Sequence, residues 1–165
     1  MTAEYFIKHL QLEPHPEGGF FKETYRSPGT LPPECLSAGF KGERSYSTAI
    51  YFLLQQGDFS AFHRIASDEC WHFYEGGSLL IHIINKEGNY SCVLLGRNVD
   101  EGEVFQFVVP AHCWFASEPA PNTDFSLVGC TVSPGFDFAD FEMADKHRLS
   151  QQYPEHNSII HRLCR

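Results

Sequence analysis

The chain has 165 residues, of which 42% are hydrophobic and 15% aromatic, and its formal net charge at pH 7 is −9. A chain of this size and apolar content is typical of a packed core, which excludes a disordered protein and predicts a single domain over residues 1–165. Because it contains no run of Lys or Arg, the sequence also excludes nucleic acid and anionic membranes as main partners, since both require a basic surface.

The start of the chain and its cysteines indicate a cytoplasmic protein. Residues 1–9 lack the basic region and long apolar core of a signal peptide, and no stretch approaches the roughly 18 apolar residues of a membrane span. The six cysteines form no Cys-x-x-Cys pair. We therefore expect reduced thiols, several of them buried, rather than a zinc knuckle or a thioredoxin-like motif.

Hydrophobic periodicity predicts a short helix followed by a long β-rich region. Over residues 3–11 apolar side chains share one helical face, and Pro14 ends this helix. Short runs of β-branched and aromatic residues then alternate with Gly, Pro, Asn and Asp, which is typical of an all-β domain. The clearest predicted strands span residues 20–26, 47–54, 60–66, 69–74, 79–85, 90–95, 105–109 and 125–132. About eight strands at this spacing indicate a sandwich or a barrel.

The connections between these strands carry further signals. Four polar, glycine-bearing turns of hairpin length predict antiparallel pairing of consecutive strands, and they are residues 56–58, 75–77, 86–89 and 100–102. The Pro- and Gly-rich residues 27–45 predict a long irregular loop, either a lid over a pocket or a passive surface loop. Near the end of the chain, residues 143–149 and 154–163 predict two helices.

A spaced pattern of polar residues lies between Gly57 and Gly76. His63 follows Gly57 by six residues, and Glu69 follows His63 by six. This spacing resembles the first motif of the cupins, Gly-x5-His-x-His-x3-Glu-x6-Gly, with Ile65 in place of the second His. A weaker match to the second cupin motif, Pro-x-Gly-x-x-His, starts at Pro110 and has His112 and Phe115 in place of its Gly and His.

In metal-dependent cupins the three His and one Glu of these motifs hold one metal ion. Ile65 and Phe115 cannot donate a lone pair, so the resemblance implies no bound metal and no cofactor here. A metal site would need a third ligand beside His63 and Glu69, because protein sites usually supply at least three donors. His82 and His112 are the candidates, and His72 could join only through a bulge, since strand alternation points it to the opposite face from Glu69.

A second resemblance lies near the amino terminus. Residues 16–26, Pro-Glu-Gly-Gly-Phe-Phe-Lys-Glu-Thr-Tyr-Arg, are similar to the signature Asp-x-Arg-Gly-Phe-Phe-x-Glu of the dTDP-sugar 3,5-epimerases, which are metal-free cupins. In those enzymes a His at the place of His63 is the base at carbons next to a carbonyl. Gly18 stands where that family has an Arg that helps to hold the nucleotide phosphates, so recognition of a dTDP-sugar is not implied.

Taken whole, the chain resembles an uncharacterised cupin family. Four segments carry the likeness: residues 15–20, 47–54, 62–76 and 126–138. The resemblance implies an all-β, double-stranded β-helix (a jelly-roll cupin barrel like that of the dTDP-sugar epimerases) with short helices at both ends, a polar pocket for a small-molecule ligand, and a homodimer. Because residues other than Gly tolerate positive φ poorly, His112 predicts a local turn that differs from the cupin motif.

We expect His63 to be a general base and Glu69 to orient it, because imidazole titrates near neutrality. The alternative is a core histidine held by a hydrogen bond to Glu69. Strand alternation lets only one of Glu23 and Arg26 point into the barrel unless a bulge intervenes, and the set with Glu23 and Tyr25 is favoured over the set with Arg26. The candidate ligand-binding residues are Glu23, Tyr25, Arg26, Trp71, Phe73 and Trp114, with core packing as the alternative for the aromatic ones.

These residues predict a barrel that binds a small polar, carbohydrate-like or nucleotide-linked carbonyl compound. The expected activity is a metal-independent epimerase or isomerase reaction with His63 as base. Two alternatives stay open: a metal-dependent oxygenase or isomerase that uses an additional His, and a binding module without catalysis.

Overall fold

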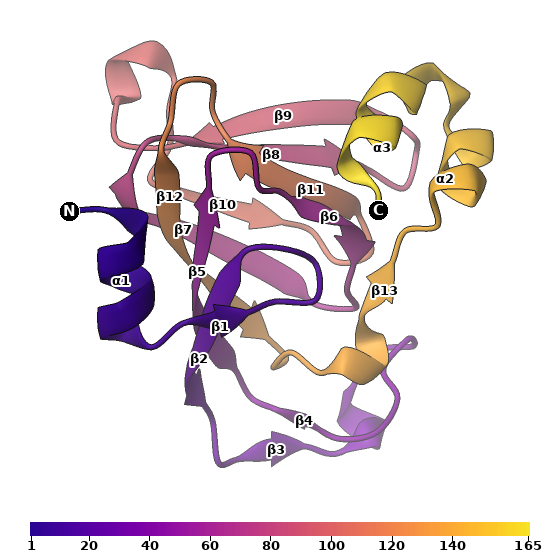
Figure 1. Cartoon of the computed structure of the whole chain (residues 1–165). Helices are drawn as coiled ribbons and strands as arrows, with labels where there is room; N and C mark the ends of the chain where they lie inside the picture. The colour runs from indigo at the N-terminus through magenta and orange to yellow at the C-terminus, as the bar shows by residue number, and fades with distance from the viewer.

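The computed structural model describes all 165 residues and opens with helix α1 (Ala3–Leu10) (Figure 1). The Thr2 hydroxyl accepts a hydrogen bond from the backbone N–H of Tyr5 and so caps the first turn. Gln11 ends the helix in the left-handed conformation. None of the helices combines the length and the apolar composition that crossing a bilayer requires.

Most of the chain folds into two antiparallel sheets. The six-stranded sheet has the order β1 (Glu13–Pro14), β2 (Phe20–Arg26), β5 (Thr48–Gln55), β12 (Phe125–Ser133), β7 (Asp68–Gly76) and β10 (Gln106–Val109). The five-stranded sheet has the order β13 (Glu142–Met143), β6 (Ser60–Arg64), β11 (Trp114–Pro119), β8 (Leu79–Ile84) and β9 (Tyr90–Leu95). The fold is therefore the predicted all-β jelly-roll barrel.

Shorter elements complete the chain. Strands β3 (Thr30–Leu31) and β4 (Arg44–Ser45) form a two-stranded ribbon within the predicted long loop, which also holds the 3-10 turn η1 (Pro33–Cys35). The other elements are η2 (Val99–Glu101), η3 (Phe138–Asp140), α2 (Lys146–Gln152), η4 (Pro154–His156) and α3 (Asn157–Leu163). All six cysteines are free thiols.

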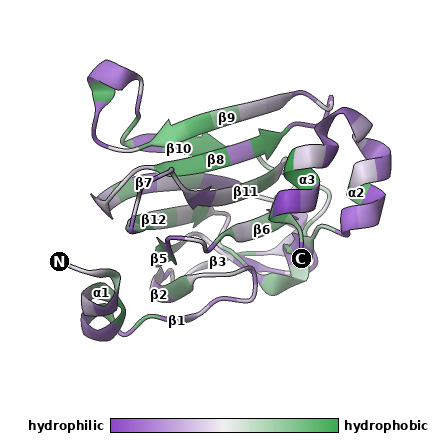
Figure 2. Cartoon of the chain, turned by 45° about the horizontal axis from the view of Figure 1, so that its top comes forward, coloured by the Kyte–Doolittle hydropathy of each residue, from purple (hydrophilic) through white to green (hydrophobic).

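The main core lies inside the barrel, where both sheets contribute side chains. It includes Phe52, Trp71 and Phe115, each at most 1% exposed. Two smaller clusters lie outside the sheets: α2 and α3 pack on Phe62 and Trp114, and α1 packs on the outer face of the six-stranded sheet. Figure 2 shows the hydrophobic residues concentrated along the strands, with α2 mainly hydrophilic. The helices thus cover the barrel from outside and leave its interior to the strands.

The predicted strands match the structure closely, but β11 and the four two-residue strands were not predicted, and the pairing expected at three turns is wrong. Strand β11 was missed because Trp114–Pro119 ends in Pro and lacks a simple alternation. The turn 86–89 does join a hairpin, β8 to β9. The other three turns connect strands of different sheets, so the expected pairing of consecutive strands is wrong there. In a jelly roll a short turn can also carry the chain across the barrel end, from one sheet to the other.

Candidate functional site

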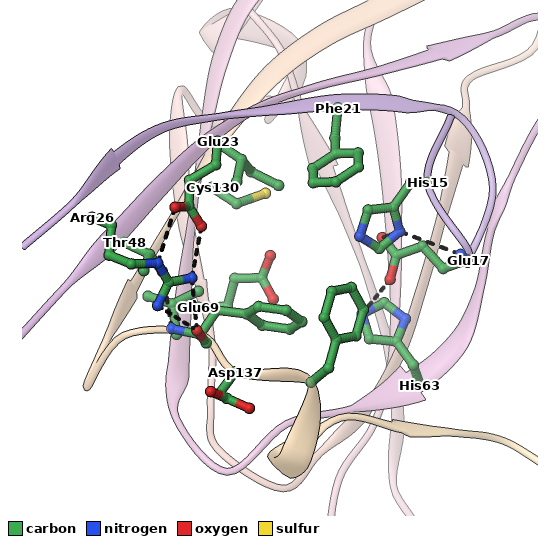
Figure 3. A pocket seen from close by; sticks show the side chains of 14 residues that line it. His15, Glu17, Phe21, Glu23, Arg26, Thr48, His63, Glu69, Cys130 and Asp137 are labelled. Carbon is green, nitrogen blue, oxygen red and sulfur yellow. Dashed lines mark hydrogen bonds and ion pairs between the residues drawn. The ribbon is translucent and has the colours of Figure 1, made fainter. Parts of the chain in front are cut away.

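A cavity of about 230 Å³ lies inside the barrel, between strands of both sheets and the segment that follows β12 (Figure 3). We call it the barrel cavity. Its polar lining residues are His15, Glu17, Glu23, Arg26, Thr48, His63, Glu69, Cys130 and Asp137, and its apolar ones are Phe21, Ile50, Val132, Phe136 and Phe138. Ionisable side chains therefore face one another across an aromatic-lined space.

His63 is held rigidly in the wall of this cavity. Its side chain is 3% exposed, and its Nδ1 donates a hydrogen bond of 2.7 Å to the carbonyl oxygen of Ala61. Its Nε2 lies 3.1 Å from Oε2 of Glu17. Because a carbonyl oxygen can only accept, Nδ1 carries a proton, and Nε2 and the Glu17 carboxyl share the next one.

The electrostatics of this Glu17–His63 pair favour the form in which neither group is charged. Burial raises the pKa of Glu17 to about 7 and lowers the pKa of His63. Desolvation penalises the charged form of each group, so the pKa of the acid rises and the pKa of the imidazole falls. Both changes favour the uncharged forms. The shared proton therefore rests on the Glu17 carboxyl, and the lone pair of His63 Nε2 beside it is free to accept a proton.

The tight turn before β2 positions Glu17 and His15. The backbone N–H of Glu17 donates to Nδ1 of His15 at 3.3 Å, and the N–H of Gly18 donates to the carbonyl of His15 at 3.0 Å. Gly18 has a φ of 118°, and a Cβ there would overlap the carbonyl oxygen of Phe59. An Arg like that of the sugar epimerases therefore cannot occupy this position without moving the backbone.

Glu69 enters the cavity from β7 and contacts different partners than expected. Burial raises its pKa to about 7, and the Cys130 thiol donates a hydrogen bond to its carboxylate. The carboxyl in contact with the His63 imidazole is that of Glu17, so the structure places Glu17, rather than the expected Glu69, where it can orient the ring. Glu69 influences His63 through its charge, across the cavity, and is a separate proton donor or acceptor.

A bulge in β2 brings both Glu23 and Arg26 to the cavity. The register of β2 against β5 shifts between Glu23 and Tyr25, so the strict alternation that separates these side chains is broken. The guanidinium of Arg26 donates to both carboxylate oxygens of Glu23, at 2.9 and 2.7 Å, and also to the carbonyl of Phe136. Tyr25 is 52% exposed and outside the cavity lining, contrary to the prediction.

The other three predicted ligand-binding aromatics also lie away from the cavity. Trp71 shares the inward face of Glu69 but is 1% exposed within the core, edge-on to Phe52. Phe73 packs at the margin of that core, with Arg97 over its ring. Trp114 belongs to the cluster beneath α2 and α3, because its neighbour Phe115 takes the inward position on β11. These three predictions are therefore wrong as to placement.

The residues of the barrel do not fit the metal site of metal-dependent cupins. Phe115 lies directly opposite His63 in the pairing of β11 with β6, at the place of the fourth ligand, and Ile65 is buried in the core. No group of three His, Cys, Asp or Glu side chains is arranged to hold a metal ion. His82 is hydrogen-bonded to Tyr90 and Glu118, so it does not join the cavity either.

His112 has a left-handed backbone conformation, which is uncommon for residues other than glycine. Its φ is 67°, in the left-handed region, and its backbone N–H donates to the carbonyl of Ile65 at 2.8 Å. His112 therefore adopts a positive φ that glycine at this place would adopt without strain, and the expectation of a different turn stays a prediction. Its side chain lies on the far side of Ile65 and lines a separate hollow.

The sequence interpretation gave no role in the site to His15 and Glu17. Glu17 lies within the epimerase-like segment 16–26, and no spacing rule links it to His63. The run His-Pro-Glu-Gly-Gly was the available signal, because two consecutive glycines before a strand indicate a tight turn. Phe136 and Phe138, from the segment that follows β12, line the cavity as well.

Comparisons with known proteins agree with this architecture. The family model described as Cupin superfamily (DUF985) matches residues 4–144. The uncharacterized protein YML079W of Saccharomyces cerevisiae is 35% identical over 148 residues, which are 84% of this chain and 73% of the yeast protein. A solved hypothetical protein from Leishmania major is 37% identical, with a TM-score of 0.91 over 99% of both chains. Protein SO0799 from Shewanella oneidensis is 42% identical, with a TM-score of 0.90 over 100% of this chain and 98% of that one.

Proposed function

The chain belongs to the Cupin_5 family of the cupin superfamily (DUF985), and we propose that its barrel cavity binds a small neutral, carbohydrate-like carbonyl compound and isomerises or epimerises it by proton transfer. One observation carries the proposal: Glu17, His63 and Glu69 are buried around one cavity, and burial has moved their pKa values in opposite directions. Groups that gain and lose protons near neutral pH are what acid–base catalysis needs.

The charges of the cavity favour a neutral ligand. Its one guanidinium, Arg26, is already engaged by Glu23, and Asp137 adds another carboxylate. A phosphate group would face these acids without a free cation to offset them. Hydroxyl groups, in contrast, can donate to the carboxylates, and the faces of Phe136 and Phe138 suit the C–H surface of a sugar-like ring.

The geometry supports a proton relay in which His63 is the final base. Oε1 of Glu17, which lies 3.7 Å from Nδ1 of His15, takes a proton from the carbon next to the carbonyl, while the proton on Oε2 moves to Nε2 of His63. The electron pair of the broken C–H bond shifts to the carbonyl oxygen, which takes the proton of the Glu69 carboxyl. Return of the Glu17 proton to the neighbouring carbon, while the hydroxyl on that carbon's partner gives its proton to the Glu69 carboxylate, gives the isomer. Its return to the original carbon after the enediol has turned its other face toward Glu17, with a proton passing from the enediol oxygen to Glu69, gives the epimer. No oxidant or reductant is needed.

Hydrogen exchange with solvent tests this proposal directly. The protein is incubated in D2O with a panel of neutral aldoses and ketoses, and NMR follows loss of the C–H signal next to the carbonyl. We expect exchange with the wild type for at least one sugar, and a loss of about 100-fold or more in His63→Asn and Glu17→Gln, because each removes one site of the relay.

A histidine on the outer face of the barrel provides the control. His72 lies on β7 with its ring bonded to Thr131 and Gln106, outside the cavity lining, so His72→Asn should exchange at the wild-type rate. Absence of exchange with every sugar, or equal rates in His63→Asn and the wild type, would contradict the proposed reaction. Sugar binding without exchange would leave the alternative of a binding module.

A further inference from the structure

A second hollow, of about 650 Å³, lies on the other side of the segment that returns from β12 to α2. We call residues 136–143, which include η3 and β13, the strap, and the second hollow the basic hollow. Phe136 and Phe138 of the strap line the barrel cavity, and residues 139–142 line the basic hollow. Figure 1 shows the strap passing beside the loop that carries β3 and β4. The remaining lining residues of the basic hollow are Gly39, Lys41, Arg64, Ile65, Ala66, Lys86 and His112.

The two acids of the basic hollow are already paired, and two of its cations are not. Asp140 receives hydrogen bonds of 2.6 Å from the guanidinium of Arg44, and Glu142 lies 2.7 Å from Arg64. Lys41 and Lys86 have no carboxylate within 4 Å. A protein of net charge −9 thus gathers two uncompensated ammonium groups around one concave surface.

The side of the basic hollow that bears Lys41 is fixed in place. The Arg44–Asp140 ion pair is buried, with side chains 4% and 5% exposed. Arg44 also donates to the carbonyl of Lys41 at 3.2 Å, and the N–H of Lys41 donates to Asp140 at 3.3 Å. These contacts join the loop to the strap and hold the backbone of Lys41 in place. A ligand that binds Lys41 therefore avoids the entropic cost of ordering the loop.

An imidazole stands in this hollow at a strained backbone position. His112 has a φ of 67°, which a Gly would adopt without strain, and its ring forms no hydrogen bond within the protein. Gly39 faces it: a Cβ there would lie 3.3 Å from Cε1 of the ring, so the absence of a side chain lets the loop close over the imidazole. The His112 side chain is partly exposed at the wall of the hollow, and its ring nitrogens have no partner in the protein, so they are free to bond a ligand there.

We propose that the basic hollow is a binding site for a phosphate group, held by Lys41, Lys86 and His112. Two ammonium groups and an imidazole supply donors to phosphate oxygens and offset their charge. The barrel cavity, where carboxylates engage the only guanidinium, has the opposite character. The site does not involve the proposed catalytic residues, so this proposal can be tested independently of the proposed function.

Titration calorimetry at low ionic strength tests the site with three probes: inorganic phosphate, a hexose 6-phosphate and a nucleoside diphosphate. These probes distinguish a free ion from the phosphate of a larger ligand. We expect binding of at least one probe, weakened about tenfold or more in Lys41→Gln/Lys86→Gln. His112→Gly should also weaken binding, with an unchanged or higher melting temperature, since glycine adopts this φ freely.

Two controls identify the site. Lys8→Gln/Lys146→Gln removes the same charge from α1 and α2, away from the basic hollow, and should bind as the wild type does. His63→Asn should also keep phosphate binding, whatever becomes of its activity. The proposal is overturned if no probe binds at up to about 10 mM, if the basic-hollow variant binds as the wild type does, or if the control variant loses as much affinity.

Discussion

The barrel cavity and the basic hollow are built from similar side chains, yet they present opposite charges. Both contain acids, histidines and basic groups, and both use the strap as a wall. In the barrel cavity the guanidinium of Arg26 is occupied by Glu23, which leaves carboxylates facing the space. In the basic hollow the carboxylates of Asp140 and Glu142 are occupied, which leaves lysines. Pairing within the wall, more than composition, decides which ligand each space can accept.

Loss of the ion pair that holds the strap should have the largest effect on stability, because the strap forms a wall of both the barrel cavity and the basic hollow. Asp140→Ala leaves the buried guanidinium of Arg44 without its partner, and we expect the free energy of unfolding to fall by about 3 kcal/mol. Urea denaturation measures this loss. The exposed pair on the same strap is the control: Glu142→Ala should cost less than about 1 kcal/mol, because Arg64 stays in contact with water. Equal losses would show that the strap is not held by the buried pair.

The acidic character of the barrel cavity predicts a stability that falls as pH rises. Glu69 has a pKa of about 7 in the folded chain against an ordinary value of 4.5, so the folded state binds its proton more tightly. The stabilisation that this proton gives to the folded state is complete below about pH 4.5 and is lost as the pH rises through 7. Glu69→Gln removes this dependence. The free energy of unfolding of the variant, relative to that of the wild type, should therefore rise by up to about 3 kcal/mol from pH 5 to pH 8.

Urea denaturation of both proteins at the two pH values checks this gain. Glu17 and His63 titrate in both proteins, so the difference between them reports Glu69 together with its charge interaction with these two groups. Glu87→Gln, in the exposed turn between β8 and β9, serves as the matched control and should show no such gain. If the variant and the wild type differ in stability by the same amount at pH 5 and at pH 8, the pKa of Glu69 is not raised in the folded protein.

The smallest expected effect is a change in the charge of the barrel cavity, which would come to resemble the basic hollow. Glu23→Gln removes the charge that engages Arg26 and leaves its guanidinium free to attract an anion. Sulfate should then compete with the sugar in the hydrogen exchange assay, with a several-fold rise in apparent KM in the variant and little change in the wild type. If sulfate inhibits both proteins alike, pairing with Glu23 does not control what the barrel cavity accepts.

Local patterns predicted much of the fold and part of the site. The bounds of β2 and β9 agree with their predicted ranges, and the motif spacing correctly placed His63 and Glu69 around one space. The pairing of Glu17 with His63 escaped prediction, because a turn near the amino terminus meets β6 only once the barrel has closed. The bulge in β2 escaped it too, since a register shift depends on the partner strand β5.

The sequence by itself determined which side chains share a face wherever a strand is unbroken, as in Glu69 and Trp71, because alternation along a regular strand is a property of the strand alone. Only the tertiary structure decided how deep each one lies: Glu69 and Trp71 share a face, yet Glu69 reaches the barrel cavity while Trp71 fills the core. It also decided which charges are cancelled, since Arg44 and Asp140 come from distant parts of the chain. Depth and long-range pairing depend on how the sheets close and where the strap returns, and the spacing of residues along the chain records neither.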